Sequence, residues 1–497
     1  MRVSNYVIGA PLQNDNHYIL MHGFTGAVDK VSYSLGQYLV ERRGTNCQPE
    51  DEIIRSLSQE TLSHLESRGY LTNMDKNEER SVMIRIASTL HENDLRTSPA
   101  GFMLIPTFTC NLRCPYCFQS HEMHAGRKEF ATVMTRERVD QAFAAMDQFA
   151  GPGSVATALG LINDSLDSPL ETIKMPKSPI TLFGGEPLSS VSLPIIPYIV
   201  EQANLRGRTL SAVTNGVELD KFVDLLGPGL IEELQITLDG LAELHDKRRV
   251  GPKFRRTFET IVTNIETALQ RGARVSVRLN IDTTNIADIS GLNEYFTRLG
   301  WNEEPGFSAY AAVVFSAYKR PENISQADLV RLTTNLKDTE DSHIESYEQW
   351  ARNTLISCLS GDGYPFKRVT HCAAETGLLI FDPLGDVYTC WEETGQRERR
   401  IATYGKQGLQ FIDKTAGQWL SRFPGAIEQC SECPYALIHT AGCASHARSI
   451  SGTIFASACE SFQEFFPQTL ARAYLDFENA LLNSNTLLKP NTEDEIA

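Results

Sequence analysis

The sequence has no apolar run near the ~20 residues of a membrane-spanning helix, and it has no cluster of lysines and arginines. Acidic residues outnumber basic ones by 62 to 46, which gives a formal charge of −16. Sequence-independent binding of nucleic acids depends on clustered basic side chains. Residues 1–20 are interrupted by Asn5, Pro11 and Asn14–Asn16, unlike a secretory signal. We therefore expect a soluble, cytoplasmic protein that binds neither membranes nor nucleic acids.

The composition is that of an ordinary globular protein, with 41% hydrophobic and 22% charged residues among 497. Such a length predicts roughly two to four domains and a sizeable core. Such a core does not need cysteine cross-links or metal sites for its stability. In a chain without a signal peptide, the 11 cysteines therefore favour metal ligands or catalytic thiols over disulfides. Three lie within Cys110–Cys117 and seven within Cys358–Cys459, whereas Cys47 stands alone and is expected to be structural.

The first segment, residues 1–95, has the pattern of a small independent module. Residues 6–8 and 17–20 are typical of short strands, and the apolar positions between Val28 and Leu39 follow helical spacing. A second short helix carries Leu62 and Leu65 and should stop at Gly69. Strands combined with small helices predict a winged-helix-like module.

Residues 96–315 alternate between strand and helix patterns, which predicts an α/β domain. One helix should follow Thr135 as its N-cap, another should cover Phe258–Gln270, and residues 151–178 have the pattern of an insertion. The alternation favours a parallel sheet with right-handed crossovers, either open or rolled into a partial barrel. The predicted strands are Gly101–Thr109, Ile180–Phe183, Leu210–Val213, Leu234–Leu238, Val275–Ile281 and Phe307–Val314.

Three further segments follow the predicted sheet. Residues 316–370 have the pattern of a helical bridge, and residues 371–470 form a cysteine-rich segment with few strand signals. Residues 471–497 should form a C-terminal helix and a polar, acidic tail whose composition predicts disorder. The sequence contains no internal repeat.

The first cluster of cysteines is Cys110-x3-Cys114-x2-Cys117, directly after the first predicted strand. Structural zinc sites are normally closed by four ligands, whereas three thiolates leave one metal position open. This spacing therefore favours a cubane 4Fe-4S cluster with one iron free for a substrate or cofactor. The alternative is a structural zinc site or a set of buried thiols.

With Tyr116 before the third cysteine, this loop resembles that of the radical SAM superfamily. The resemblance implies a partial (β/α)6 barrel, a 4Fe-4S cluster and S-adenosylmethionine (SAM) as cofactors, and an electron donor such as flavodoxin or ferredoxin. A second match is Gly184-Gly185-Glu186-Pro187 after the next strand. In the family this motif binds the amino group of SAM, and Gly-Gly lets a ligand approach the backbone closely.

Weaker matches follow at the ends of later strands. Thr214 and Asn215 end the third strand, and Thr237 ends the fourth. The resemblance implies that Thr237 and Arg249 contact the SAM carboxylate, with Arg278 and Asn280 on the fifth strand. The alternatives are a simple turn at Asn215-Gly216 and a helix cap or surface salt bridge between His245 and Arg249.

A second group of cysteines lies near the C-terminus and resembles the SPASM extension, which binds two auxiliary 4Fe-4S clusters. The resemblance implies that Cys372, Cys390 and Cys443 hold the first auxiliary cluster, and that Cys430, Cys433 and Cys459 hold the second. Cys358 is a candidate fourth ligand of the first cluster, or else a buried thiol.

His439 stands where the SPASM pattern has a cysteine. Three interpretations are open: an iron ligand, the neighbour of an open iron site, or part of a Cys3His zinc site with Cys430, Cys433 and Cys443.

The resemblance implies an enzyme that modifies a ribosomally made precursor peptide, giving crosslinks or thioethers. The N-terminal module would then pair a leader peptide with its exposed strand, or would simply cap the barrel. A formylglycine maturase of the sulfatase type is the alternative enzyme. Such maturases usually carry Asp after the second SPASM cysteine, whereas here Trp391 is followed by Glu392 and Glu393.

The two glutamates are either acid/base candidates or solvated surface charges. An alternative of another class is a zinc-stabilised, peptide-binding scaffold without catalysis. The open loop of three cysteines, coupled to Gly184–Pro187, argues against a scaffold.

Overall fold

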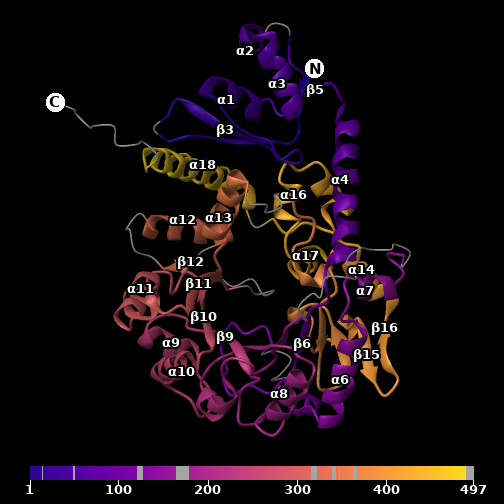
Figure 1. The fold of residues 1–497 in the computed structure, drawn as a ribbon, viewed down its shortest axis with the longest axis vertical. Helices are drawn as coiled ribbons and strands as arrows, with labels where there is room; N and C mark the ends of the chain where they lie inside the picture. The colour runs from indigo at the N-terminus through magenta and orange to yellow at the C-terminus, as the bar shows by residue number, and fades with distance from the viewer. Residues whose placement is uncertain are drawn as a thin grey trace, which may run out of the picture.

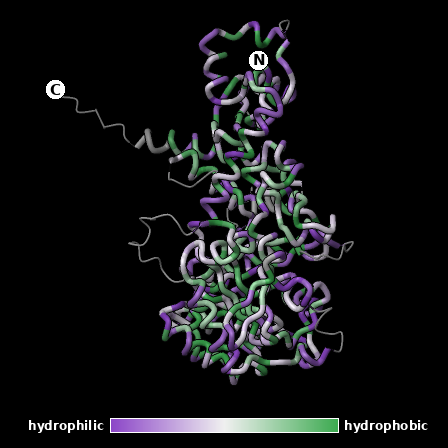
Figure 2. The backbone as a smooth tube through the Cα atoms, turned by 90° about the vertical axis from the view of Figure 1, so that its right-hand side faces the viewer, coloured by the Kyte–Doolittle hydropathy of each residue, from purple (hydrophilic) through white to green (hydrophobic). Residues whose placement is uncertain are grey.

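The computed structural model describes residues 1–13, 15–48, 51–119, 127–163, 178–314, 322–337, 343–345, 347–361, 367–459 and 461–487. Figure 1 shows three regions: the N-terminal module at the top, the large sheet with its helices at the bottom, and the cysteine-rich region along the right-hand side. The turned view in Figure 2 shows that the molecule is elongated along the same vertical axis. No helix within these ranges is both long and apolar enough to cross a bilayer.

The centre of the molecule is a sheet whose strands β6 to β12 are parallel and lie in sequence order. Its strands are β6 (Phe102–Leu104), β7 (Ile180–Leu182), β8 (Leu210–Thr214), β9 (Ile231–Thr237), β10 (Arg274–Ile281), β11 (Phe307–Val313) and β12 (Ile344–Glu345). Strands β6 to β11 confirm the places of the six predicted strands and the partial barrel. The first is shorter than predicted, since only Phe102–Leu104 of residues 101–109 form a strand. The sheet is open, since β12 and β16 form its two edges.

Helices cover the outer face of this sheet (Figure 1). They are α6 (Arg136–Gln148), α8 (Ile196–Leu205), α9 (Ala242–Arg248), α10 (Phe258–Gln270) and α11 (Asp288–Arg298). The Thr135 side chain caps α6 by accepting a hydrogen bond from the Arg138 N–H at 3.2 Å, as predicted. On β10, Val275, Val277, Leu279 and Ile281 are buried and the alternate side chains are more exposed. The polar face of the strands is therefore free to line a site.

The cysteine-rich region contributes strands β13 (Leu379–Phe381), β14 (Asp386–Tyr388), β15 (Ala402–Gly405) and β16 (Gly408–Phe411). Strand β13 pairs in parallel with β6, and the others follow as an antiparallel meander. The prediction of a region with few strands was therefore wrong. Each strand has only three or four residues, too short to show an alternating pattern.

The N-terminal module contains a three-stranded antiparallel sheet and a two-stranded pairing of β1 with β5. Its elements are β1 (Arg2–Val3), β2 (Val7–Pro11), β3 (His17–His22), β4 (Val28–Ser32), α1 (Tyr33–Glu41), α2 (Glu52–Ser56), α3 (Gln59–Arg68) and β5 (Leu71–Thr72). Helix α3 ends at Gly69, whose φ of 94° suits glycine, as predicted. The single helical stripe from Val28 to Leu39 was wrong, because residues 28–32 pair with β3 and helix α1 begins only at Tyr33.

A 22-residue helix, α4 (Lys76–Thr97), runs from this module down the side of the molecule (Figure 1). It begins with a capping box formed by Asp75 and Glu78. The sequence analysis missed this helix because two of its five buried positions, Glu79 and His91, are polar and interrupt the apolar stripe.

The remaining helices surround the cysteine-rich region. They are α7 (Ser154–Ala158), α12 (Gln326–Lys337), α13 (Tyr347–Ser360), α14 (Asp413–Leu420), α15 (Glu428–Ser431), α16 (Ala436–His439), α17 (Ala444–Ser451) and α18 (Phe462–Leu487). Short 3-10 turns cover Lys128–Ala131, Leu219–Leu225, Trp301–Glu303, Ala373–Glu375, Trp391–Glu393, Arg397–Arg399 and Pro424–Ala426. Helix α18 packs between the N-terminal sheet and α13. Residues 164–177, half of the predicted insertion, and the end of the predicted tail lie outside the described residues.

Candidate functional site

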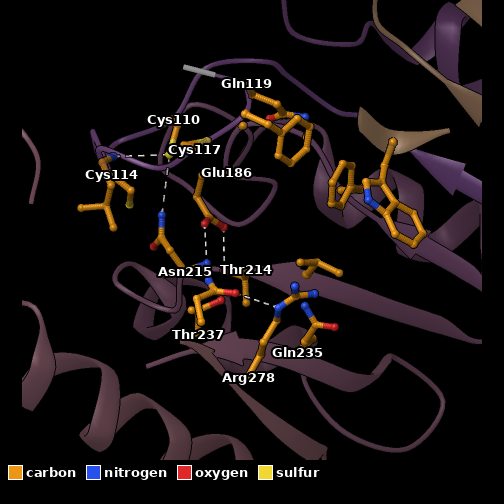
Figure 3. A pocket seen from close by; sticks show the side chains of 18 of the residues that line it. Cys110, Cys114, Cys117, Gln119, Glu186, Thr214, Asn215, Gln235, Thr237 and Arg278 are labelled. Carbon is orange, nitrogen blue, oxygen red and sulfur yellow. Dashed lines mark hydrogen bonds between the residues drawn. The ribbon is translucent and has the colours of Figure 1, made fainter. Parts of the chain in front are cut away.

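The three-cysteine loop follows β6 at the carboxyl ends of the parallel strands. Cys110, Cys114 and Cys117 line one cavity of about 280 Å³ together with the turns after the neighbouring strands (Figure 3). The Cys117 N–H donates to the Cys114 carbonyl at 3.2 Å, and the Leu112 N–H points to Cys110 Sγ at 3.4 Å. Burial raises the pKa of the Cys110 thiol to about 12. A metal that binds here must therefore displace protons from the thiols.

The two glycines of the next turn pack directly against the segment that leads into this loop. Gly185 N–H donates to the Thr107 carbonyl at 3.1 Å, and a Cβ at Gly185 would lie 2.2 Å from the Phe108 carbonyl oxygen. Gly184 has a φ of 121°, and its Cβ would lie 2.7 Å from the Thr107 oxygen. The contact between two backbones, in addition to ligand access, therefore requires glycine at both positions.

Glu186 is buried in the wall of the cavity, only 1% exposed. Its Oε1 accepts the Thr214 hydroxyl at 2.6 Å and the Leu188 N–H at 2.9 Å, and its Oε2 accepts the Asn215 N–H at 2.6 Å. Burial raises the pKa of this carboxyl, and these hydrogen bonds lower it. Three donors thus fix the carboxylate beside the thiols, where a cationic ammonium group would be favoured.

Asn215 links the third strand to the cysteine loop. Its Nδ2 donates to Asn111 Oδ1 at 2.7 Å and lies 3.9 Å from Cys110 Sγ. Asn111 in turn donates to Glu218 Oε2 at 3.0 Å. The predicted turn at Asn215-Gly216 therefore also holds the loop of thiols in place.

Thr237, Arg249 and Asn280 complete the predicted set and all line the same cavity. The surface salt bridge considered for His245 and Arg249 is wrong, because His245 is fully buried and Arg249 is 7% exposed. The His245 ring accepts the Asp239 N–H at 3.3 Å and contacts the Thr257 hydroxyl at 3.1 Å, which fixes the turn into α9. Pro187 stands next to Glu186 but does not line the cavity.

The sequence analysis missed several residues that line the opposite side of the cavity. Gln235 lies on β9, and Phe118 and Phe183 form a stacked pair with ring centroids 6.5 Å apart. The signal for Gln235 was its inward position on β9, beside Val213 and Ser276 of the neighbouring strands. Arg278 also lines this side (Figure 3), and its Nε donates to Asn280 Oδ1 at 2.9 Å.

Glu392 and Glu393 are not solvated surface charges. Glu393 is 4% exposed and forms an ion pair with Arg448 of α17. Glu392 lines the cavity next to Trp391, and burial raises the pKa of its carboxyl to about 8 although Arg278 lowers it. The turn of Trp391–Glu393 lies between the cavity and α17, which explains why both glutamates are sequestered.

Cys372, Cys390 and Cys443 are neighbours in the cysteine-rich region. Burial raises the pKa of Cys372 to about 12, and the charge of Cys443 raises it further. Burial also raises the pKa of Cys390, and both Cys443 and Cys372 contribute to that rise. These mutual effects place the three thiols of the first predicted auxiliary set together.

Cys430, Cys433, Cys459 and His439 line one small cavity of about 20 Å³. His439 and Cys459 also line an adjacent cavity of about 170 Å³ with Cys443 and His371. Burial lowers the pKa of His439 to about 3, so its imidazole is neutral and keeps a lone pair for a metal. Cys358, in α13, lines neither cavity. His439 and Cys459 therefore lie at the same two cavities.

Among the described residues, no three His, Cys, Asp or Glu side chains converge in the way that a single metal ion requires.

The residues of the sheet and its cavity match a known family. Residues 104–292 match the radical SAM superfamily. The chain is 26% identical to the GTP 3',8-cyclase of Synechocystis sp. over 202 residues, which are 40% of this chain and 51% of that protein. It is 27% identical to the probable GTP 3',8-cyclase of Methanococcus maripaludis over 174 residues, 35% of this chain and 46% of that protein. The chain spans about half the length of the curated relatives that it matches.

Among solved structures, native anSMEcpe with bound AdoMet and Kp18Cys peptide has a TM-score of 0.53. The identity is 15%, and the match covers 77% of this chain and 100% of that chain. This likeness shows the fold. Residues 104–292 therefore resemble the radical SAM superfamily in sequence, within a chain that shares its fold with anSMEcpe.

Proposed function

We propose that this radical SAM enzyme abstracts hydrogen from a ribosomally made peptide and installs an oxidative crosslink or thioether. The observation that carries the proposal is the single cavity that holds Cys110, Cys114 and Cys117 on one side and the buried Glu186 on another. When bound, the reduced cluster supplies the electron that cleaves SAM to methionine and a 5′-deoxyadenosyl radical. The protein supplies ligation, orientation and exclusion of solvent.

The chain's own residues divide the work of holding SAM. The Glu186 carboxylate would accept the amino group, since its donors hold it beside the thiols. Thr237, Arg249 and Asn280 line the cavity at the ends of the next strands and would hold the carboxylate and ribose. Thr214 and Asn215 act through Glu186 and Asn111. Tyr116 contacts this set from the cysteine loop.

The other side of the cavity has the features of a site for a peptide side chain. Phe118, Phe183 and Trp391 offer an apolar surface, and Trp391 is 42% exposed at the rim. Arg278 and Glu392 lie on the same side, where burial raises the pKa of the Glu392 carboxyl to about 8 and so favours its uncharged form at neutral pH. Such a surface suits an uncharged segment with a bulky side chain better than an anionic nucleotide.

The N-terminal module would recognise a leader peptide by strand addition. Strand β4 is an edge of its three-stranded sheet and is only half-buried, so its outer N–H and C=O groups can pair with an extended chain. Arg68 of α3 already occupies the Val28 carbonyl at 3.0 Å and pairs with Asp29 at 2.8 Å. A leader strand would therefore pair with the later residues of β4.

The two auxiliary groups of thiols would hold 4Fe-4S clusters that accept the surplus electron. Cys390 is followed directly by Trp391 and Glu392 of the cavity, so the first auxiliary group adjoins the reacting peptide. We assign His439 as the fourth ligand of the second group, because it shares a cavity with Cys430, Cys433 and Cys459. A flavodoxin or ferredoxin would supply the reducing electron.

One observation favours a second candidate, the oxidation of Cys or Ser to formylglycine. Glu392 lines the cavity two residues after Cys390, close to the place where sulfatase maturases carry an acid/base group. The chain also shares its fold with anSMEcpe, which was crystallised with a Cys peptide. The N-terminal module and the absence of Asp after Cys390 favour the first candidate.

The test incubates anaerobically reconstituted, reduced enzyme and SAM with each short peptide encoded beside the gene, and separately with a Cys sulfatase peptide and with GTP. We expect a mass loss of hydrogen only in a neighbouring precursor, together with 5′-deoxyadenosine. Conversion of the sulfatase Cys to an aldehyde would establish the second candidate. Consumption of GTP without any change in a peptide would overturn the peptide assignment, and Cys114→Ala is the control without activity.

A further inference from the structure

Tyr116, which lies between two of the cluster cysteines, is joined by its hydroxyl to the far wall of the cavity. The hydroxyl donates to Asp239 Oδ2 and accepts a hydrogen bond from Arg249 Nη1 at 2.6 Å. Asn280 Nδ2 lies 3.5 Å from the same oxygen. Asp239 is fully buried and Arg249 is 7% exposed, so these contacts are shielded from water. Hydrogen bonds between charged or polarised groups in such a place are stronger than at the surface.

Arg249 is only partly satisfied by these contacts. Its Nη1 lies 3.9 Å from Asp239 Oδ2, beyond hydrogen-bond distance, and its Nε is buried without a partner among the described residues. The guanidinium lines the cavity that holds the cysteines and Glu186. A buried donor without a partner is unfavourable, so an anionic group in the cavity is the natural partner for Nε.

The neighbouring Arg248 does not compete for this role, because other groups anchor it. Its Nη1 donates to Asp282 Oδ2 and to Thr284 Oγ1, both at 2.8 Å. Its guanidinium lies 5.1 Å from the centroid of the Tyr116 ring. Arg248 Nε also lies 3.5 Å from Asp239 Oδ2, so Asp239 faces both arginines. Only Arg249 of the two lines the cavity.

We infer that Tyr116 and Asp239 are positioning residues, which hold one edge of the Arg249 guanidinium so that its remaining donors face the carboxylate of SAM. This inference rests on the proposed function, since it concerns how the same cavity binds SAM. Asp239 fixes the Tyr116 hydroxyl, and the hydroxyl oxygen then fixes Arg249 Nη1. Tyr116 stands between Cys114 and Cys117, in the loop that would bind the cluster. Its side chain therefore connects the position of this loop to the position of Arg249, which would bind SAM.

The inference predicts which part of the cofactor depends on Tyr116. S-adenosylhomocysteine carries the amino acid carboxylate, whereas 5′-methylthioadenosine has the adenosine and sulfur but no amino acid part. Equilibrium binding of each ligand to the full-length, anaerobically reconstituted protein separates the two. In Tyr116→Phe we expect the Kd for S-adenosylhomocysteine to rise about tenfold, equivalent to about 1.4 kcal/mol. The Kd for 5′-methylthioadenosine should change less than twofold.

A matched control is Tyr198→Phe, which removes a Tyr–Asp hydrogen bond of 2.6 Å to Asp140 on the outer face of the barrel. It should change neither Kd. Iron content and thermal unfolding show whether each variant retains its fold and clusters. If Tyr116→Phe loses iron, Asp239→Asn provides the test in its place, because it weakens the hydrogen bond that fixes the Tyr116 hydroxyl and should give the same selective loss of S-adenosylhomocysteine. Arg249→Lys should show this loss as well.

Tyr116→Phe and Arg249→Lys also form a double-mutant cycle. In the Arg249→Lys background, Tyr116→Phe should weaken S-adenosylhomocysteine less than twofold, because Tyr116 acts through Arg249. Equal weakening of both ligands by Tyr116→Phe, or additive effects in the cycle, would overturn the inference while leaving SAM binding intact. A wild-type protein that binds neither ligand would instead remove the proposed function, and the inference with it.

Discussion

The Glu186 carboxylate accepts the backbone N–H of Asn215 at 2.6 Å, which joins the turn after β7 to the end of β8. Glu186 N–H itself donates to the Thr109 carbonyl at 3.0 Å, directly before Cys110. One residue therefore links three neighbouring turns at the carboxyl ends of the strands. The wall of the cavity depends on these contacts as much as on the side chains that face it.

Gly185→Ala should disrupt this wall. The new Cβ would lie 2.2 Å from the Phe108 carbonyl oxygen, and a backbone contact cannot be relieved by a change of rotamer. We expect the variant to lose the iron of the Cys110 cluster and to form no 5′-deoxyadenosine. Gly417→Ala is the matched control, because its Cβ meets nothing within 4 Å. A Gly185→Ala protein with full iron content would contradict this account.

Glu186→Gln should destabilise the protein even without cofactor. One carboxylate oxygen becomes an NH2 group, which cannot accept a hydrogen bond. This group faces either the Asn215 N–H or the Thr214 hydroxyl and the Leu188 N–H. Leaving such buried groups unsatisfied costs about 1–3 kcal/mol in the free energy of unfolding. Urea denaturation measures the loss. The exposed Glu243→Gln, which breaks only a surface pair with Lys247, should leave the free energy of unfolding close to that of the wild type.

His22 should make the N-terminal module sensitive to acid. Its Nδ1 accepts the Thr25 N–H at 3.2 Å, so the neutral ring carries its proton on Nε2, 2.9 Å from the Ser4 hydroxyl oxygen. Burial lowers the pKa of His22 from 6.5 to about 3. Between these values the unfolded chain binds a proton that the folded chain does not. Stability from this residue is therefore lost as pH falls below 6.5, by up to about 1.4 kcal/mol per pH unit.

The measurement compares unfolding of wild type and His22→Gln from pH 7 to pH 4.5. The variant should show a shallower loss of stability towards acid. His64→Gln replaces a histidine that is mostly exposed, so it should follow the wild-type pH dependence. Parallel curves for all three proteins would show that His22 does not contribute.

The iron and zinc content of variants tests which auxiliary cysteines share a cluster. Cys443→Ala should remove only the first auxiliary cluster and Cys459→Ala only the second, each lowering about 12 irons per chain by about four. His439→Cys should retain the iron of the second cluster because it supplies the usual thiolate. If one zinc is found and is lost in Cys443→Ala, the Cys3His arrangement of Cys430, Cys433, His439 and Cys443 is correct instead.

The sequence predicted the barrel well because strands β8 to β11 have five to eight residues, long enough to show their pattern, and amphipathic helices separate the strands. Strand β10 and helix α10 illustrate this, since both carry a regular buried face. Cys110–Cys117 and Glu186 were found because their chemistry depends on local spacing.

What the sequence did not reveal depends on partners that are distant in the chain. Helix α4 was hidden because Glu79 is buried by pairing with Arg2, 77 residues away. Glu393 looks like a surface charge until Arg448 is placed beside it. The role of Tyr116 depends in the same way on Asp239 and Arg249, which only the fold brings to the cysteine loop.

The most direct test of the central claim is the formation of 5′-deoxyadenosine and methionine from SAM by the anaerobically reconstituted, reduced protein. We predict both products from the wild type. We predict neither product from Cys114→Ala, which should remain folded and keep about eight irons in its auxiliary clusters. Unchanged SAM cleavage in Cys114→Ala, or a wild-type protein that holds zinc and essentially no iron, would contradict the assignment.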